Sequence, residues 1–380
     1  MDDSLQSKDP SDFKSVAKES KIKAALSNTF RNYLFLYSAM SMIIIGLVIF
    51  YFFFSYLLNE AYKRLDAVNV TVEDQLEEKL EALKDHARVL SANHTVADAM
   101  ENFRHQFRLI NADTSLLLSD NEFENAVINL KSHYNAHYLA PLNAALNSNH
   151  TVEEFFPQDR RTRLLQHLYI SGNPNPPGEK HLLDKGLDFS TFSKRHLEFH
   201  PFLRHVVENY DLKDLLLVDN ESGYIVYSTA KHVDFGTSLI SGPYRQTLLA
   251  NAVKQASEAG SRDFVYISDI EYYYPAGAVP VFYVTSPVFS GNRKIGILAF
   301  KIAIDEIEHI VSVSENESNI LGESGENLII GRDFRVRNTM RRFQEEPEEF
   351  KKQLRKLNFN KEVIQKMQSL GTTTLLYQIN

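Results

Sequence analysis

The chain has 380 residues, a formal net charge of −8 and no cysteine. This length allows two or more domains with additional helical segments. The lack of cysteine excludes disulfide bonds and thiolate metal sites, and in a chain of this size it favours a bacterial source. The acidic balance argues against nucleic-acid binding, because no basic stripe is present to displace counterions from phosphates.

Residues 33–58 form an uncharged run of apolar and aromatic residues. As a helix rising about 1.5 Å per residue, this run is long enough to cross a hydrocarbon core of about 30 Å. A core helix of a soluble domain is usually polar on one face. A cleaved signal peptide has a shorter apolar region and a shorter leader. The sequence therefore predicts an uncleaved transmembrane helix.

The charges around this helix predict its orientation. Residues 1–32 are the expected cytoplasmic tail, and the mixture of charge, serine and proline in residues 1–20 is typical of disorder. By the positive-inside rule, the N-terminus lies in the cytoplasm and all residues after 58 lie in the periplasm, outside a bacterial inner membrane. The basic residues before the span are Lys18, Lys21, Lys23 and Arg31, and those soon after it are Lys63 and Arg64.

Residues 59–170 are expected to form a periplasmic helical segment. Its first part is an amphipathic helix, because apolar residues recur at steps of three and four between acidic and basic ones. This stripe consists of Leu65, Val68, Val72, Leu76, Leu80, Leu83, Ala87 and Leu90. Two interpretations of this stripe stay open: the helix packs on the chain's own domain, or it forms the stalk of a homodimer. Both can hold at different positions along the same helix.

Residues 171–210 contain a proline-rich connector followed by a helix. The connector begins with "SGNPNPPGEKHLLD", which combines glycine and lysine as phosphate-binding loops do. However, Pro174, Pro176 and Pro177 have no N–H group to offer a phosphate. Glu179 also separates the second glycine from the lysine, against the Walker pattern. A structural connector without a nucleotide is expected.

Residues 211–315 show the pattern of an antiparallel sheet. "DLLLVDNESGYIVYST" predicts a strand, a turn and a second strand, and "GPYRQTLLANAVKQASEAG" predicts a helix. "DFVYISDIEYYYP", "VPVFYVTSPVFS" and "KIGILAFKIAIDEIEHIVS" predict three further strands, the last running into a helix. Two strands, a helix and three antiparallel strands follow the order of a PAS-like sensor fold, so the predicted class is α+β.

Residues 316–380 repeat this pattern weakly. "NLIIGRDFRVRNT" predicts strand, turn and strand, the next stretch predicts helix, and "TTTLLYQIN" begins another strand. The last strands are missing, so we expect an incomplete second module. Because no second apolar span exists, the chain is also expected to be the N-terminal part of a longer protein.

Six stretches from about Tyr169 onward, together spanning over half of the chain, resemble double Cache sensor regions of bacterial transmembrane receptors. They are "YISGNPNPPGEKHLLD", "KRHLEFHPFLR", "DLLLVDNESGYIVYSTAKHVDFGTSLISGPY", "IGILAFKIAIDEIEHI", "LGESGENLIIGRD" and "GTTTLL". The resemblance implies that 211–315 is a membrane-distal Cache module within an extracytoplasmic sensor. In that family such sensors precede methyl-accepting chemotaxis domains, nucleotide cyclases or histidine kinases. "RVRNTMRRF" and the missing second span depart from the family pattern.

The resemblance thus predicts the sensory input part of a membrane-bound signalling receptor, most simply of the chemoreceptor type, which binds a small molecule. The alternative is the non-catalytic front of an adenylate or guanylate cyclase or of a histidine kinase. A third interpretation is a stand-alone anchored binding protein. No Ser/His/Asp or paired-carboxylate arrangement with catalytic logic is visible in the sequence, so no catalytic residue and no cofactor are predicted, and an enzyme output stays open.

Tyrosines of the sheet region are the leading candidates for ligand contacts. A tyrosine offers a flat apolar surface and one hydroxyl, which suits a concave site for a small polar ligand. An arginine in that site could bind a ligand carboxylate, and an aspartate could accept from an ammonium group. Alternate strand residues point to opposite sides, so about half of these tyrosines would face the core or a dimer. The predicted residues are Tyr227, Arg245, Tyr266, Asp269, Tyr272, Tyr274 and Tyr283.

Histidines raise the question of a metal. Pairs four residues apart share a helix face, but a metal site needs a third ligand and groups that orient the rings. No cysteine or carboxylate stands at ligand spacing, so packing is expected rather than metal binding. The histidines concerned are His133, His137, His196, His200 and His205.

The predicted topology has a direct test. A reporter enzyme that is active only in the periplasm should be active when fused after Asn102 and inactive when fused after Lys14, because the charge bias keeps the tail inside. Activity of the two fusions is measured in intact cells at matched expression. The reverse pattern would contradict the orientation.

Overall fold

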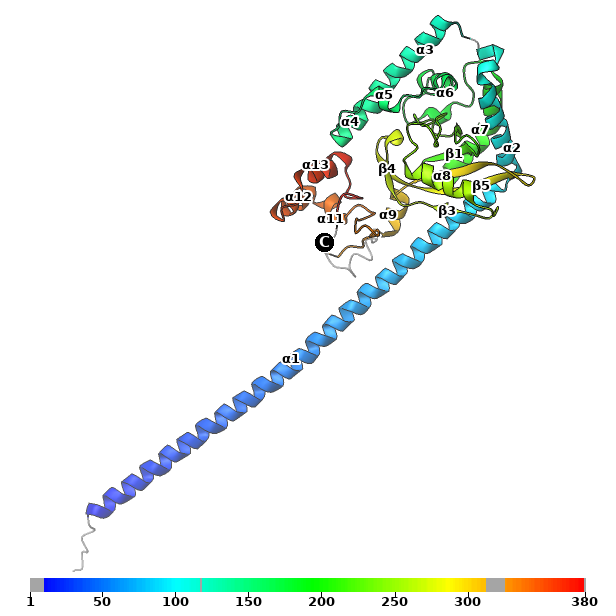
Figure 1. Cartoon of the computed structure of the whole chain (residues 1–380). Coiled ribbons are helices and arrows are strands. Elements are labelled where there is room, and N and C mark those ends of the chain that lie inside the picture. Colours follow the sequence, from blue (N-terminus) through cyan, green and yellow to red (C-terminus); the bar gives the residue numbers. More distant parts are fainter. Residues whose placement is uncertain (1–9, 117, 312–324, 379–380) are drawn as a thin grey trace, which may run out of the picture. The chain divides into compact units, whose positions relative to one another are not determined.

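The computed structural model describes residues 10–116, 118–311 and 325–378 (Figure 1). The chain divides into two compact units, residues 1–68 and 69–380. The predicted boundary at 315/316 and the first nine residues of the predicted tail lie outside the described residues.

The first unit consists of the N-terminal part of a single long helix, α1 (Pro10–Ser91). Residues 10–20, for which the composition predicts disorder, already belong to this helix, so that prediction is wrong for them. The apolar run 33–58 lies within α1 with its side chains exposed. Among the described residues, α1 is the one helix that is long and apolar enough to cross a membrane. The chain therefore fits a single-pass membrane protein.

The C-terminal part of α1 belongs to the second unit and packs on it. Leu83, Ala87 and Leu90 are buried in the core of this unit, and Val72 and Leu76 are partly buried against it. The apolar stripe from Val72 onward thus serves the helix's own domain, as the first of the two interpretations predicted.

Helices dominate residues 92–210. Asn93 caps α2 by accepting from the amide of Thr95, and Ser119 with Glu122 forms a capping box on α3. The elements are α2 (His94–Leu109), α3 (Asp120–His133), a π-helical segment (Tyr134–Leu139), α4 (Ala140–Leu146), α5 (Val152–Phe155), α6 (Arg160–Gln166), a second π-helical segment (His167–Ser171) and α7 (Thr191–Asn209). Short 3-10 turns (Ile110–Ala112, Thr114–Leu116 and Lys180–Leu182) join them.

An antiparallel sheet follows, as the sequence predicts. Its strands run in the order β2-β1-β6-β5-β3, and β4 also pairs with β5. The elements are β1 (Asp214–Asp219), β2 (Ile225–Ser228), α8 (Leu248–Glu258), β3 (Tyr266–Ile267), β4 (Glu271–Tyr273), a 3-10 turn (Tyr274–Ala276), β5 (Val279–Ser290), β6 (Arg293–Ala303) and α9 (Asp305–Val311). The stretch "DFVYISDIEYYYP", expected as one strand, forms the two short strands β3 and β4. The α+β fold class is confirmed.

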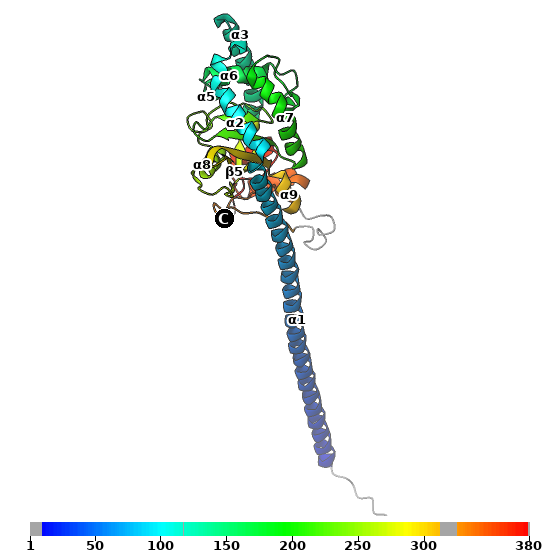
Figure 2. The same cartoon turned by 90° about the vertical axis from the view of Figure 1, so that its right-hand side faces the viewer.

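Helices cover both faces of the sheet. α2 and α7 pack against each other and against one face, where they are adjacent in both views (Figure 1, Figure 2). α8 packs on the opposite face, where Thr285 of β5 donates a hydrogen bond to the carbonyl of Ala252. Every residue of β1 is buried, because this strand lies between two helical layers. We call these the α2/α7 face and the α8 face.

The proline connector is held by its own side chains. The ammonium group of Lys180 is buried and donates to the carbonyl of Asn173 at 2.8 Å. The amide of Asn173 in turn donates to the carbonyls of Tyr169 and Lys180. The lysine that suggested a phosphate loop is therefore used inside the connector.

The segment 325–378 carries α11 (Arg341–Glu345), α12 (Pro347–Lys356) and α13 (Lys361–Leu370) around a small apolar cluster of its own. The strands expected in "NLIIGRDFRVRNT" and "TTTLLYQIN" are absent from the described part of this segment. Single bridges join Ile330 to Val336 and Arg335 to Gln378 instead. A two-stranded pairing without further strands is marginal, which explains why the local pattern does not extend into a ladder.

Candidate ligand-binding site

A buried ion pair lies at the centre of the α8 face. Lys301 of β6 is directly opposite Asp214 of β1, and both side chains are fully buried with Nζ and Oδ2 3.1 Å apart. Asp214 also accepts hydrogen bonds from the amides of Thr229 and Ala230 and from the hydroxyl of Ser228. Burial alone would raise the pKa of Asp214, but the Lys301 charge and these donors outweigh it and hold the pKa below its usual range.

A second buried carboxylate, Asp234, shares the same lysine less closely. Its Oδ2 lies 3.8 Å from Nζ of Lys301 and accepts a hydrogen bond of 2.6 Å from the hydroxyl of Tyr273. Its Oδ1 is buried, and no described residue donates a hydrogen bond to it. Within the described part of the chain, Oδ1 of Asp234 is therefore a buried acceptor that receives no hydrogen bond.

Five tyrosines surround Asp234 and form what we call the tyrosine cluster. Their rings touch one another directly or through Phe155, with centroid distances between 5.5 and 6.4 Å. Burial raises the pKa of each tyrosine, and the negative charge of Asp234 raises it further. The cluster consists of Tyr134, Tyr138, Tyr244, Tyr273 and Tyr283.

Three hydroxyl groups of the tyrosine cluster have no hydrogen-bond partner among the described residues. The hydroxyls of Tyr138 and Tyr244 lie close enough to influence each other's pKa as hydrogen-bonding groups, and so do the Tyr283 hydroxyl and the Glu271 carboxylate, but neither pair meets hydrogen-bond geometry in this structure. The three groups and Oδ1 of Asp234 therefore offer both donors and an acceptor within one buried region.

Glu271 joins this region to helix α8. Its carboxylate accepts hydrogen bonds from the amides of Leu248 and Leu249, the first two residues of the helix. An anion at this position is favoured by the helix dipole. Burial nevertheless raises the pKa of Glu271 above its usual value.

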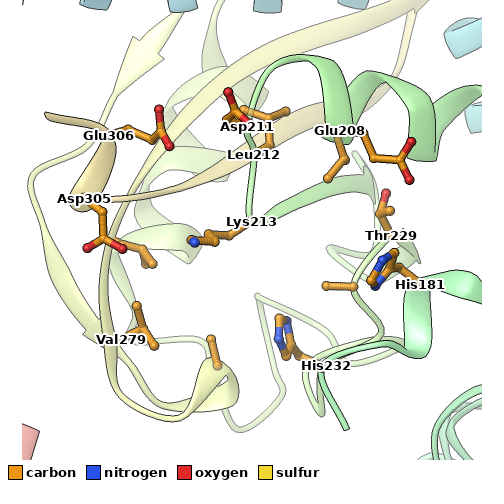
Figure 3. A pocket seen from close by; sticks show the side chains of 15 residues that line it. His181, Glu208, Asp211, Leu212, Lys213, Thr229, His232, Val279, Asp305 and Glu306 are labelled. Carbon is orange, nitrogen blue, oxygen red and sulfur yellow. The ribbon is translucent and has the colours of Figure 1, made fainter. Parts of the chain in front are cut away.

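A pocket of about 590 Å³ lies on the other side of His232 (Figure 3), and its lining includes neither Asp234 nor a residue of the tyrosine cluster. His181 and His232 line one side of it, and Asp305 and Glu306 line the opposite side. Nδ1 of His232 lies 3.2 Å from Nζ of Lys301. His232 therefore separates the pocket from the buried ion pair.

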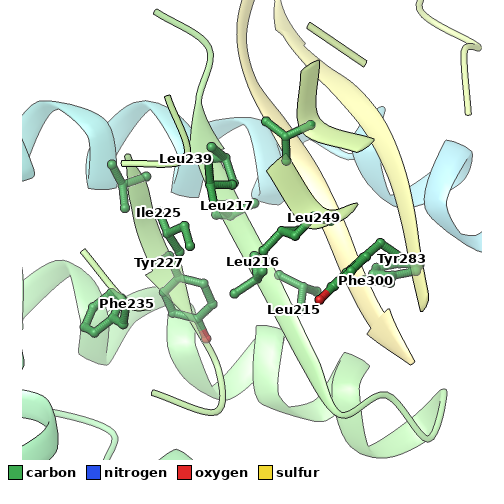
Figure 4. Close-up of a cluster of buried hydrophobic side chains, with 14 of the residues drawn as sticks. Leu215, Leu216, Leu217, Ile225, Tyr227, Phe235, Leu239, Leu249, Tyr283 and Phe300 are labelled. Atoms are coloured by element: carbon green, nitrogen blue, oxygen red, sulfur yellow. The ribbon is translucent and has the colours of Figure 1, made fainter. Parts of the chain in front are cut away.

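The structure distributes the sequence-predicted residues over several places. Tyr283 belongs to the tyrosine cluster, and Tyr274 lies beside it, with its ring against His150 and Phe155. Tyr227 lies in the cluster of buried side chains that Figure 4 draws. It points to the α2/α7 face, where its ring stacks on Phe103.

The other four predicted residues lie apart from Asp234. Arg245 is exposed and lines a separate pocket of about 590 Å³ between α8 and the β1–β2 turn. Tyr266 is partly buried in β3, opposite Thr285. Asp269 and Tyr272 contact the C-terminal segment instead, through Arg337 and the carbonyl of Thr374. Contact of these side chains with a ligand stays a prediction.

Sequence reasoning missed Asp214, Asp234, Lys301 and Tyr273. The sequence did contain one signal for Asp214 and Lys301, because both are charged residues within otherwise apolar strands. Charged side chains are buried only when they are paired, so each of the two required a partner. Strand alternation determines which of the consecutive tyrosines reaches Asp234. Glu271 and Tyr273 of β4 point to the side of Asp234, while Tyr272 points to the opposite side.

His196 and His200 of α7 lie in a different cluster, on the α2/α7 face, whereas His205 of the same helix is exposed. Nδ1 of His196 donates to the carbonyl of Asp184, and Nε2 of His200 donates to that of His181. Lys231 lies close by, with its ammonium group 5.0 Å from the ring centroid of Tyr227, and burial lowers its pKa to about 7. Within the described ranges, no group of three or more His, Asp or Glu side chains suits a metal ion.

The sequence matches no protein-family model and no curated protein. Two solved structures are similar in part. The sensor domain of the V. cholerae histidine kinase DctB is 15% identical, with a TM-score of 0.23 over 50% of this chain and 58% of that chain. The ligand-binding domain of the Pseudomonas fluorescens chemoreceptor CtaA, solved in complex with L-serine, is 12% identical, with a TM-score of 0.25 over 56% of this chain and 66% of that chain. The chain spans less than two thirds of either, and TM-scores this low carry no argument about its function.

The buried histidines predict a loss of stability in mild acid. Burial, and then the charge of Lys231, lowers the pKa of His196 well below its usual value and that of His200 to about 2. Below about pH 6.5 the unfolded chain binds protons that the folded chain does not, so the free energy of unfolding falls by up to about 1.4 kcal/mol per pH unit for each histidine. Urea unfolding measured between about pH 6.5 and 4.5 should show this slope.

Lys231 contributes little to this slope. With a pKa of about 7 in the folded chain, it differs in protonation between the folded and the unfolded chain mainly above pH 7, outside this range. The substitution His196→Phe should reduce the slope by the share of one histidine. The matched substitution at the exposed His105, H105F, should leave it unchanged. An unaltered slope in H196F would contradict the assignment.

Proposed function

We propose that this chain is the sensory input part of a bacterial membrane receptor and that its ligand binds at Asp234. The observation that carries the proposal is the buried Oδ1 of Asp234, which receives no hydrogen bond from any described residue and lies within a cluster of tyrosine hydroxyls. An unsatisfied buried polar group costs about 1–3 kcal/mol, and more when it is charged. A bound molecule that donates to this oxygen would remove that cost.

The chemistry of the cluster indicates the class of ligand. Oδ1 of Asp234 can accept from an ammonium or hydroxyl group, and the hydroxyls of Tyr138, Tyr244 and Tyr283 can donate to ligand oxygens. The tyrosine rings supply flat apolar walls. A small amine that also carries oxygen acceptors, such as an amino acid, suits both kinds of group.

The remaining features support a receptor rather than a free binding protein. The apolar run 33–58 is long enough to anchor the chain in a membrane, and the basic residues before it support a cytoplasmic N-terminus with the sheet module in the periplasm. The antiparallel sheet with a helix inserted after its second strand agrees with a PAS-like module at 211–315. We propose a double Cache arrangement in which 316–380 begins the second module and the long helix forms a homodimer.

The output domain follows from the resemblance alone. A chemoreceptor is the preferred interpretation, and the front part of a membrane cyclase or histidine kinase is the alternative. Ligand binding would bias one of two positions of the C-terminal part of α1, which packs on the module.

The proposal predicts ligand-dependent stabilisation. The common L-amino acids and short diamines are tested one by one on the full chain in detergent, with thermal unfolding followed by near-ultraviolet circular dichroism of the tyrosines. A ligand at about 100 times its Kd adds about 2.7 kcal/mol to the free energy of unfolding, which raises the melting temperature. In D234N the shift should disappear, because the acceptor for the ammonium group becomes an amide.

D263N is the matched control, because Asp263 is exposed and lies outside the cluster. This variant should keep the full shift. A shift that persists unchanged in D234N would place the ligand elsewhere in the chain. A panel in which no amine raises the melting temperature would contradict the proposed ligand class.

A further inference from the structure

Strand β4 has two sides with different partners. On the α8 face, Tyr273 donates to Asp234, and Glu271 holds the first amides of α8. Both contacts belong to the proposed ligand site. The strand is three residues long and, within the described residues, pairs only with β5. It is therefore a short edge strand held by few backbone bonds.

Tyr272, on the other side of β4, and Asp269, which precedes the strand, contact the C-terminal segment 325–378. Nε and Nη2 of Arg337 each donate to one oxygen of Asp269 at 2.8 Å, a bidentate pair. The side chain of Arg337 is buried, and it also reaches Asp333 at 2.9 Å. Tyr272 donates from its hydroxyl to the carbonyl of Thr374.

We infer that the stretch 269–273 couples the occupancy of the Asp234 site to the position of segment 325–378, which makes this segment the regulated partner of the sheet module. This inference rests on the proposed function, because it names what the same site controls. Alternation along β4 makes the coupling mechanical: a shift of Tyr273 toward or away from Asp234 moves Tyr272 with it.

The contacts favour transmission through side chains of fixed geometry. Arg337 is buried on the segment and meets Asp269 through two parallel hydrogen bonds, so the pair resists sliding. On the site side, Glu271 ties the strand to the N-terminus of α8, so a ligand that repositions Tyr273 acts on one connected set of groups. Coupling of this kind is reciprocal: what the site does to the segment, the segment does to the site.

The test uses hydrogen–deuterium exchange of the full chain in detergent, read by mass spectrometry. Y273F removes the hydrogen bond to Asp234 inside the site, and R337Q removes the pair with Asp269 on the segment. Y273F should speed exchange in 325–378, where the amides of Val336 and Leu375 are hydrogen-bonded. R337Q should speed exchange of the amides of Leu248 and Leu249. We expect about fivefold in each direction, at the low end of typical coupling.

R332Q is the matched control, because Arg332 is an exposed arginine of the same segment. It should leave exchange at Leu248 and Leu249 unchanged. The inference is overturned if the effect of R337Q stays within 325–378 and around Asp269, or if Y273F changes exchange only on the α8 face. Because Y273F acts on the site and R337Q acts on the segment, local unfolding caused by one variant would not produce the effect expected of the other.

The exchange measurement needs no ligand. It therefore tests the coupling between the Asp234 site and segment 325–378 separately from the proposed binding of an amine at that site. Absent coupling together with an amine-dependent melting shift overturns the inference alone. Coupling without any amine-dependent shift supports the inference and contradicts the proposed ligand class.

Discussion

One buried ammonium group, that of Lys301, organises the centre of the second unit. It lies between two buried carboxylates, 3.1 Å from Asp214 and 3.8 Å from Asp234. Removing one partner of a buried pair typically costs 3–5 kcal/mol, so the register of β1 against β6 is strongly fixed. Among the described residues, Asp214 accepts hydrogen bonds from three other donors and Asp234 from one. The first carboxylate is therefore committed to the fold, whereas the second keeps an oxygen available.

This difference explains how the proposed ligand site can exist in a well-packed domain. The helices α2 and α7 complete an apolar core on one face of the sheet, where Phe103 and Tyr227 stack. The α8 face instead carries carboxylates, a lysine and tyrosine hydroxyls, which need partners wherever water is excluded. Polar groups on this face that the protein itself leaves unpaired are the ones that a ligand can satisfy.

Much of this architecture can be predicted from the sequence, for identifiable reasons. The span and the apolar stripe of α1 are set by long, regular patterns, and the strands around Leu216 and Val284 by apolar runs between turns. The choice among Tyr272, Tyr273 and Tyr274 could not be made, because three identical residues in a row carry no alternation to fix their parity. The role of Asp234 also could not be seen, since it lies outside the strands and reaches Lys301 only through tertiary folding. The C-terminal strands were over-predicted, because the local pattern around Ile330 and Val336 does not reveal whether further strands are present to pair with it.

The proposed site requires a ligand group that donates a hydrogen bond to Oδ1 of Asp234. The most direct test is a high-resolution crystal structure of the protein with an amine that raises its melting temperature. The account predicts an ammonium nitrogen of that amine within about 3.2 Å of Oδ1, with ligand oxygens facing the tyrosine hydroxyls. An amine bound elsewhere, with a protein side chain or a fully bonded water occupying the acceptor position of Oδ1, would contradict it.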